Sequence, residues 1–400
     1  MIGKDSIIYS LRNLNKRKGR SFLTVFSILV GIATIFIFIS FGLGLYNYTN
    51  SFTTGSSANK LLITAKGVGI PGMSDTVILN DTDLKVVQRS AGVEKASGVY
   101  YGAAKLEKGG QVKYGYLVSY DPKDPILRQV FGIGIANGRD LQKGDTGAVL
   151  GYNYMLNDKI FNKALNVNDL VTLNGHRIKV LGFMASVGNP QDDSNVYITN
   201  NRFLKIYPNK TTYAEIVAQV DINKLNWTIN NIDRNLRHSR DLAKGKEDFF
   251  VQSFEDMVKS YSGALNIIVG FIVLIALISV LVSVVNTANT MITSVLERYK
   301  EIGVLKSIGA RNSEILGIFL FESSFLGLIA GGLGVLLGWG LSALAGNILT
   351  SLGYGFLQPS FPPLLFGGLI VFSVLTGAIS GVFPAIRASK INAVDALRYE

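Results

Sequence analysis

The chain has 400 residues, a formal net charge of +11 and no cysteine, and 48% of its residues are hydrophobic. Without cysteine the fold cannot rest on disulfides, and a thiolate zinc site is excluded. Six basic residues lie within the first 20 positions, where attraction to anionic lipid explains them. The net charge is therefore not a nucleic-acid signature, and we expect no nucleic-acid partner.

Four apolar stretches are each long enough to cross a hydrocarbon layer, which takes about 20 residues. The predicted transmembrane helices are residues 21–45, 260–288, 313–344 and 364–385. Prolines at the end of the segment Gln358–Pro363 separate the last two. The first stretch has a basic flank like a signal peptide, but it is too long and lacks a cleavage site, so we read it as an uncleaved anchor.

Basic residues in the short flanking segments set the predicted orientation. They place three segments in the cytoplasm: an amphipathic N-terminal helix at 1–20, the segment 289–312 and the tail 386–400. The uncharged loop 345–363 and the long region 46–259 then lie outside. The sequence thus predicts a multi-pass protein of the plasma or inner membrane.

The region 46–259 is predicted to be a large extracytoplasmic mixed α/β domain inserted between helices 1 and 2. Residues 121–200 are richer in Gly, Asn and Asp than the rest of the domain, which suggests two lobes. The first lobe would contain about 46–120 and 201–259, and the second about 121–200. With over 200 residues, this domain is large enough to bury its own core.

Local signals inside this domain predict individual elements. Asn80 is suited to cap a helix at Asp81–Ser90, and Asn174-Gly175 is a strong hairpin signal. Two further helices are expected at about 152–161 and 223–243. Two stalks would join the domain to the membrane, at Tyr46–Lys60 and Phe249–Lys259.

No pattern for catalysis or cofactor binding occurs in the chain. A G-x-x-x-x-G-K-[ST] phosphate loop is missing, so we expect no nucleotide on this chain. His176 and His238 are far apart in sequence, and no metal is expected. Asp192-Asp193 is a candidate cation-binding site or, more simply, two solvated carboxylates.

The segment ERYKEIGVLKSIGAR, Glu297–Arg311, stands between two long uncharged runs. A polar segment between two membrane spans must lie in water at the membrane face. Ile302, Val304, Leu305 and Ile308 recur at helical spacing, so one face can dock on a partner. The alternative, a helical hairpin cap without a partner, stays open.

Two features stand out in the third span. Glu322 is an ionisable group inside a membrane segment, where it is either functional or a carboxylate neutralised by a base at a helix end. Glycines at small-xxx-small spacing allow two helix backbones to approach closely. These glycines are Gly327, Gly331, Gly334 and Gly338. Their partner helix belongs to this chain or to a second copy.

Several motifs, taken together, resemble the MacB-type ABC transporter permeases, relatives of the FtsX-like proteins. The segment 297–311 is similar to the coupling segment of that family, E-R-x-x-E-I-G-[VI]-[LM]-[KR]-[AS]-[LI]-G-A. Gly138-Arg139-Asp140-Leu141 resembles a signature of the outer domain. The tail Ala393–Glu400 resembles the C-terminal signature, with Asp395 where the family usually has proline.

The resemblance implies a permease dimer in which each subunit docks on a cytoplasmic ABC ATPase. About 20 residues precede Ser21 here, so the ATPase, with its ATP and Mg, is expected on a separate chain. Other expected partners are lipid and an extracytoplasmic adaptor or substrate. The residues that would couple to the ATPase are Glu297, Arg298, Glu301, Ile302, Gly303, Leu305, Lys306, Gly309 and Arg311. Among them, Ile302 and Leu305 are the expected buried anchors, and Glu301 and Arg311 the charged rim.

Three functions follow as hypotheses. The first is mechanotransmission, in which ATP hydrolysis moves the outer domain to export or extract a peptide, lipoprotein or amphiphilic drug. The second is an FtsX-like regulator of an outer-surface partner such as a cell-wall hydrolase. The third, a membrane-anchored surface enzyme, is disfavoured because no catalytic set occurs. We therefore expect that the chain itself is not an enzyme.

Overall fold

The fold is taken from a computed structural model, which describes residues 18–53, 57–66 and 78–398. The predicted amphipathic helix at 1–20 lies almost wholly outside the described residues. The chain divides into two compact units. The helical unit contains residues 18–45, 264–348 and 357–398, and the strand unit contains residues 46–263 and 349–356.

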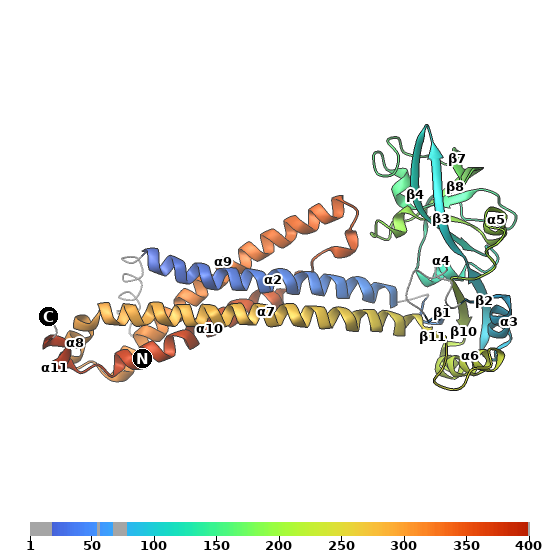
Figure 1. Cartoon of the computed structure of the whole chain (residues 1–400). Coiled ribbons are helices and arrows are strands. Elements are labelled where there is room, and N and C mark those ends of the chain that lie inside the picture. Colours follow the sequence, from blue (N-terminus) through green and yellow to red (C-terminus); the bar gives the residue numbers. More distant parts are fainter. Residues whose placement is uncertain (1–17, 54–56, 67–77, 399–400) are drawn as a thin grey trace. The chain divides into compact units, whose positions relative to one another are not determined.

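Four helices among the described residues are long and apolar enough to cross a membrane, which confirms the predicted number of spans (Figure 1). They are α2 (Lys18–Thr53), α7 (Phe254–Glu297), α9 (Asn312–Ser351) and α10 (Pro363–Ser389). Pro362 and Pro363 occupy the N-cap and the first turn of α10, where proline costs no hydrogen bond. The spans themselves lie at Thr24–Asn50, Asn266–Glu297, Asn312–Ser351 and Pro363–Ser389.

The helices run further than the apolar stretches predicted, and this corrects the two stalks. The first is mostly helix, because α2 continues to Thr53. The second is replaced by strand β11 (Phe249–Ser253) and the start of α7, which then continues without a break to Glu297. No glycine or proline interrupts residues 289–297, so the helix has no local reason to end where the predicted cytoplasmic segment began.

The first sheet of the strand unit has four antiparallel strands in the order β11-β1-β10-β2. The other three strands are β1 (Lys60–Ala65), β2 (Val93–Val99) and β10 (Glu215–Val220). Helices α3 (Asp81–Arg89) and α6 (Leu225–Ser239) contribute buried apolar residues to its core, among them Val87 and Leu236. The predicted cap is confirmed, since Asn80 accepts hydrogen bonds from the backbone of Thr82 and Asp83, and Asp83 accepts one from Asn80.

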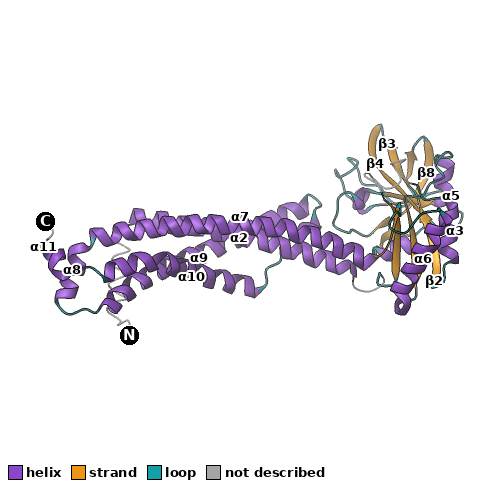
Figure 2. Cartoon of the chain, turned by 60° about the horizontal axis from the view of Figure 1, so that its bottom comes forward, coloured by secondary structure: helices purple, strands orange, loops and turns teal. Residues whose placement is uncertain are grey.

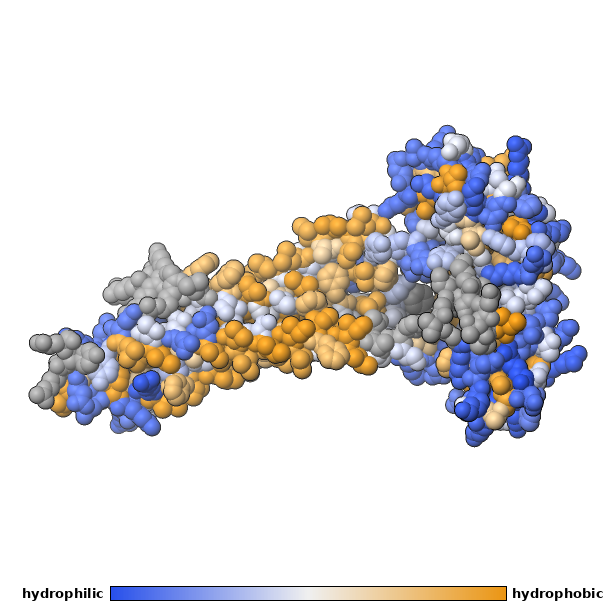
Figure 3. Space-filling view, viewed as in Figure 1, coloured by the Kyte–Doolittle hydropathy of each residue, from blue (hydrophilic) through white to orange (hydrophobic). Residues whose placement is uncertain are grey.

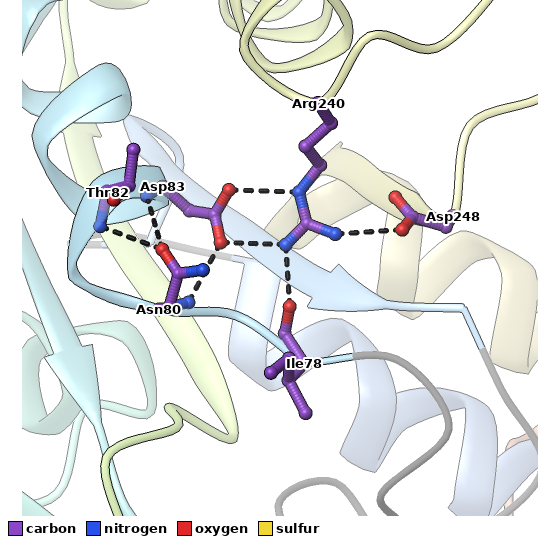
Figure 4. A network of polar contacts seen from close by, with 6 residues as sticks. All are labelled: Ile78, Asn80, Thr82, Asp83, Arg240 and Asp248. Atoms are coloured by element: carbon purple, nitrogen blue, oxygen red, sulfur yellow. Dashed lines mark hydrogen bonds and ion pairs between the residues drawn. The ribbon is translucent and has the colours of Figure 1, made fainter.

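Arg240, just after α6, fastens α3 to this sheet (Figure 4). Its guanidinium donates to both carboxylate oxygens of Asp83, at 2.9 and 2.7 Å, and to Asp248 at 2.8 Å. It also donates to the backbone oxygen of Ile78 at 2.6 Å. The Asp83 side chain is only 3% exposed, so its charge depends on this partner.

The second sheet has seven strands in the order β5-β8-β6-β9-β4-β3-β7, with β7 also pairing with β8. Six of these strands therefore close into a ring, and β5 pairs with β8 outside it. Figure 2 labels β3, β4 and β8 of this sheet. The strands are β3 (Tyr101–Lys108), β4 (Gln111–Tyr120), β5 (Ile135–Gly138), β6 (Ala148–Leu150), β7 (Leu170–Leu173), β8 (His176–Met184) and β9 (Val196–Thr199). Short helices α4 (Ile126–Val130) and α5 (Asn200–Ile206) complete the unit.

Two sequence predictions for this region are wrong, and one is confirmed. The boundary between the sheets lies at Tyr100 rather than near residue 120, because β3 and β4 pair with strands of the seven-stranded sheet. The expected helix at 152–161 is only a short 3-10 turn, Tyr152–Met155. The Asn174-Gly175 hairpin joins β7 and β8, with both residues at positive φ, 47° and 80°.

Surface hydropathy differs between the two units (Figure 3). Apolar residues cover much of the visible helical surface, whereas the strand unit is largely hydrophilic. The exposed apolar side chains are dense on α7, for example Phe271, Ile275 and Ile278. This is the pattern of a multi-pass membrane protein with a domain in water.

Candidate functional site

The predicted coupling segment forms a short helix, α8 (Tyr299–Ser307), between α7 and α9. Arg298 is the break before it, with φ −107° and ψ 16°. Gly309 ends it in the left-handed region, φ 103°, where its N–H donates to the oxygen of Lys306 and the N–H of Ala310 to that of Leu305. Glycine is favoured there because it lacks a Cβ, so this position is a helix end.

Gly303 has a different role from Gly309, because it allows a close approach between two helices. It faces the C-terminal helix α11 (Ala393–Arg398), and a Cβ built on it would lie 2.6 Å from the Cβ of Ala396. No larger residue fits without moving one of the helices. The coupling segment and the C-terminal tail, which resemble two separate motifs of the family, pack together in the structure.

Lys306 ties α8 to the end of α10. Its Nζ donates to the backbone oxygens of Ser389 and Ile391, both at 2.6 Å. A cation at a helix C-terminus satisfies carbonyl groups that have no partner within the helix. Gly303 and Lys306 therefore hold α8, α10 and α11 together as one end of the helical unit.

The apolar face expected to dock on a partner is divided by this packing. Ile302 is 2% exposed and belongs to a cluster with Met291, Phe319 and Ala388, so its expected role as a docking anchor is wrong. Leu305 packs on the same cluster and is partly buried. Tertiary packing inside the chain covers both residues, which spacing alone does not reveal.

Other apolar side chains at this end remain exposed. Val304 and Ile308 on α8 are 45% and 80% exposed, and Val394 on α11 is 69% exposed. We call these three side chains the α8–α11 surface. Glu297, Glu301 and Arg311 are also exposed. Val394 was not among the predicted coupling residues, because nothing in its own segment indicates that α11 packs on α8.

Glu322 is buried on α9 and has a specific partner. Its Oε2 accepts from Nη1 of Arg298 at 3.0 Å, and the two side chains are 6% and 4% exposed. The guanidinium lies 5.0 Å from the ring centroid of Phe319, and its Nε is 3.4 Å from the carboxylate of Glu301. The structure thus supports the alternative that a base at a helix end neutralises Glu322.

The four glycines of α9 contact helices of the same chain. A Cβ on Gly327 would lie 2.5 Å from the backbone oxygen of Ser373 on α10, and one on Gly331 would lie 2.6 Å from the Cβ of Ser373. Gly334 and Gly338 instead face α2, near Leu29 and Phe36. One stripe of small residues therefore packs two neighbouring helices closely.

The aspartates and histidines considered as metal ligands do not come together as a site among the described residues. Among the described residues, no group of three or more His, Asp or Glu side chains could hold a metal ion. Asp193 is buried and accepts hydrogen bonds from Ser186 Oγ and the backbone of Val187 and Gly188. His176 begins β8 of the seven-stranded sheet, whereas His238 lies on α6, which packs beside the four-stranded sheet.

Comparison with known proteins places the chain in a family. Residues 21–231 match the model of the MacB-like periplasmic core domain, and residues 273–393 match that of the FtsX-like permease C-terminal domain. An uncharacterized ABC transporter permease of Methanocaldococcus jannaschii is 32% identical, over 99% of this chain and 98% of that protein. The chain belongs to the MacB-type ABC transporter permeases.

More distant relatives are similar along most of the chain. The uncharacterized ABC transporter permease YknZ of Bacillus subtilis is 25% identical over 99% of both proteins. The macrolide export ATP-binding/permease protein MacB of Neisseria gonorrhoeae is 26% identical over 97% of this chain, which covers 60% of that longer protein. The periplasmic region of MacB from Actinobacillus actinomycetemcomitans matches with a TM-score of 0.42 and 14% identity, over 51% of this chain and 93% of that structure.

Proposed function

We propose that this chain is the permease subunit of an ABC transporter whose ATPase is a separate polypeptide, and that the ATPase docks on the α8–α11 surface. The observation that carries this proposal is the exposure of Val304, Ile308 and Val394 at α8 and α11, two helices that pack closely on each other. Exposed apolar side chains gathered on a water-facing end are typical of a protein interface.

The orientation supports the same reading. Basic residues near α8 and α11, including Lys300, Lys306 and Arg387, favour the cytoplasmic side for this end of the helices. The ATP and Mg would be bound by the partner, which closes as a pair on binding ATP. Movement of α8 would then pass to α7 and α9, to which it is joined, and so to the outer domain.

The names of the relatives are consistent with an ATPase on another chain. The permeases of M. jannaschii and B. subtilis are covered almost from end to end. The MacB protein of N. gonorrhoeae is named for both ATP binding and permease, and this chain covers 60% of it. We propose export or extraction of a peptide, a lipoprotein or an amphiphilic drug as the work performed, by two permease subunits together.

The test is Ile308→Asp, which places a charge at the most exposed apolar position of the surface. An anchor residue at an interface commonly contributes about 2 kcal/mol, so we expect at least about tenfold less ATPase captured with the purified permease. The measurement is co-purification from native membranes, with mass spectrometry of the bound proteins and ATP turnover in membranes.

The matched control is Leu170→Asp on β7, where the side chain is 59% exposed in the strand unit. Equal capture by both variants and the wild type would show that α8 is only a hairpin cap. The same preparation also identifies outer partners. An adaptor or cargo protein supports transport, whereas a cell-wall hydrolase supports an FtsX-like regulator.

A further inference from the structure

The Arg298 side chain is a meeting point of three helices. Its backbone is the break between α7 and α8, and its guanidinium reaches Glu301 on α8 and Glu322 on α9. The ring of Phe319, one turn before Glu322, lies against the guanidinium at 5.0 Å. Ile302 of α8 also meets α7 and α9, in an apolar cluster with Met291 and Phe319, whereas Arg298 joins the three helices through charged groups.

Stability alone is a weak explanation for such a pair. Taking a guanidinium and a carboxylate out of water is costly, and apolar residues of similar volume often replace a buried ion pair without loss. A planar guanidinium that donates from Nη1 to Glu322 and from Nε toward Glu301 does, however, impose direction, which an apolar contact does not. The pair therefore specifies one orientation of α8 relative to α9 more strongly than it adds stability.

We propose that the Arg298–Glu322 pair positions α8 on α9, so that displacement of α8 is passed to α9 instead of being absorbed at the α7–α8 break. This inference rests on the proposed docking of an ATPase at the α8–α11 surface. Arg298 and Glu322 are positioning residues, and neither needs to contact the ATPase. Ile302 is also buried between these helices, but its apolar contacts lack the directional preference of a hydrogen-bonded pair.

The test replaces both charges by apolar residues of similar size, Arg298→Met with Glu322→Leu, so that no unpaired charge is left buried. The chain has no cysteine, so two introduced cysteines can carry spin labels without background. Ser307→Cys labels exposed α8, and Gly340→Cys labels α9 where a side chain would meet nothing within 4 Å. The distance distribution between the labels reports the orientation of α8.

We expect a narrow distribution in the wild type and a broad one in the double variant. ATPase capture should be retained, while stimulation of ATP turnover by the permease in membranes should fall about tenfold. Glu314→Gln is the matched control, because it makes a similar substitution in the exposed first turn of the same helix. It should leave the distribution and the stimulation unchanged.

Two results would overturn the inference. One is wild-type stimulation by the double variant, and the other is lost stimulation with an unchanged distance distribution. If the wild-type chain captures no ATPase, the proposed function fails instead. The distance distribution, measured on the permease alone, then still decides whether the pair fixes α8.

Discussion

The two units of this chain pack their interiors in opposite ways. In the strand unit, large side chains fill the core, and the ring of Tyr100 lies 5.1 Å from that of Phe203 and 4.6 Å from that of Tyr213. In the helical unit, the closest contacts are made by the smallest residues, such as Gly327 against Gly377. Water drives burial of apolar area in the first case.

Lipid supplies no comparable force between helices, so the second unit depends on close backbone approach and on buried polar contacts. Ser373 Oγ, for example, donates to the backbone oxygen of Gly327 at 2.6 Å. The Arg298–Glu322 pair is another buried polar contact between helices of this unit. We therefore expect a larger side chain at Gly327 to damage the packing of α9 on α10, and the loss of Arg240 to damage the strand unit.

The largest effect is expected from Gly327→Leu. A side chain there overlaps the backbone of α10, whose Ser373 oxygen would lie 2.5 Å from the new Cβ. Overpacking without room to relax costs about 3 kcal/mol or more, and we expect most of the purified chain to lose its native helix packing. Thermal unfolding in detergent, followed by the exposure of a buried label, measures this.

Gly332→Leu provides the control on the same helix. A Cβ at Gly332 would meet nothing within 4 Å, so the variant should unfold as the wild type does. If Gly327→Leu is equally well tolerated, close packing of α9 on α10 is not what holds the helical unit together.

The second effect concerns Arg240→Ala in the strand unit. The substitution leaves Asp83, 3% exposed, without the guanidinium that binds both of its oxygens. Breaking a buried pair from one side costs about 3 to 5 kcal/mol. Urea unfolding of the separately expressed segment Thr49–Lys259, itself expected to fold alone, measures the loss.

Arg139→Ala is the control for this prediction. Arg139 pairs with Asp145 through a side chain that is 45% exposed, and an exposed pair contributes about 1 kcal/mol or less. Similar losses in both variants would contradict the claim that burial of Asp83 makes the Arg240 contact important.

The sequence predicted local features better than long-range ones. Asn80 and Asn174 lie in a helix cap and a tight turn, so cap and turn chemistry identifies them. The partner of Gly327 could not be predicted, because spacing on one helix does not specify which helix approaches it. The burial of Arg298 could not be predicted either, because its partner Glu322 is 24 residues away on another helix.

The smallest expected effect is a pH dependence of the stability of the strand unit, which arises from Glu215 on β10. Burial away from water raises the pKa of this carboxyl from 4.5 to about 7, against the hydrogen bond donated by Tyr101 at 3.2 Å. The folded state therefore holds the proton more tightly than the unfolded state does. Stability is highest below the unfolded pKa and falls as the pH rises from 4.5 to about 7.

Glu215→Gln keeps the acceptor for Tyr101 and removes the charge. We expect this variant to be about as stable as the wild type near pH 4.5, and more stable by as much as about 3 kcal/mol at about pH 8. Urea unfolding of Thr49–Lys259 across this range measures how the free energy of unfolding changes with pH in the wild type and in the variant. A wild type whose stability does not fall between these pH values would show that Glu215 is hydrated in solution.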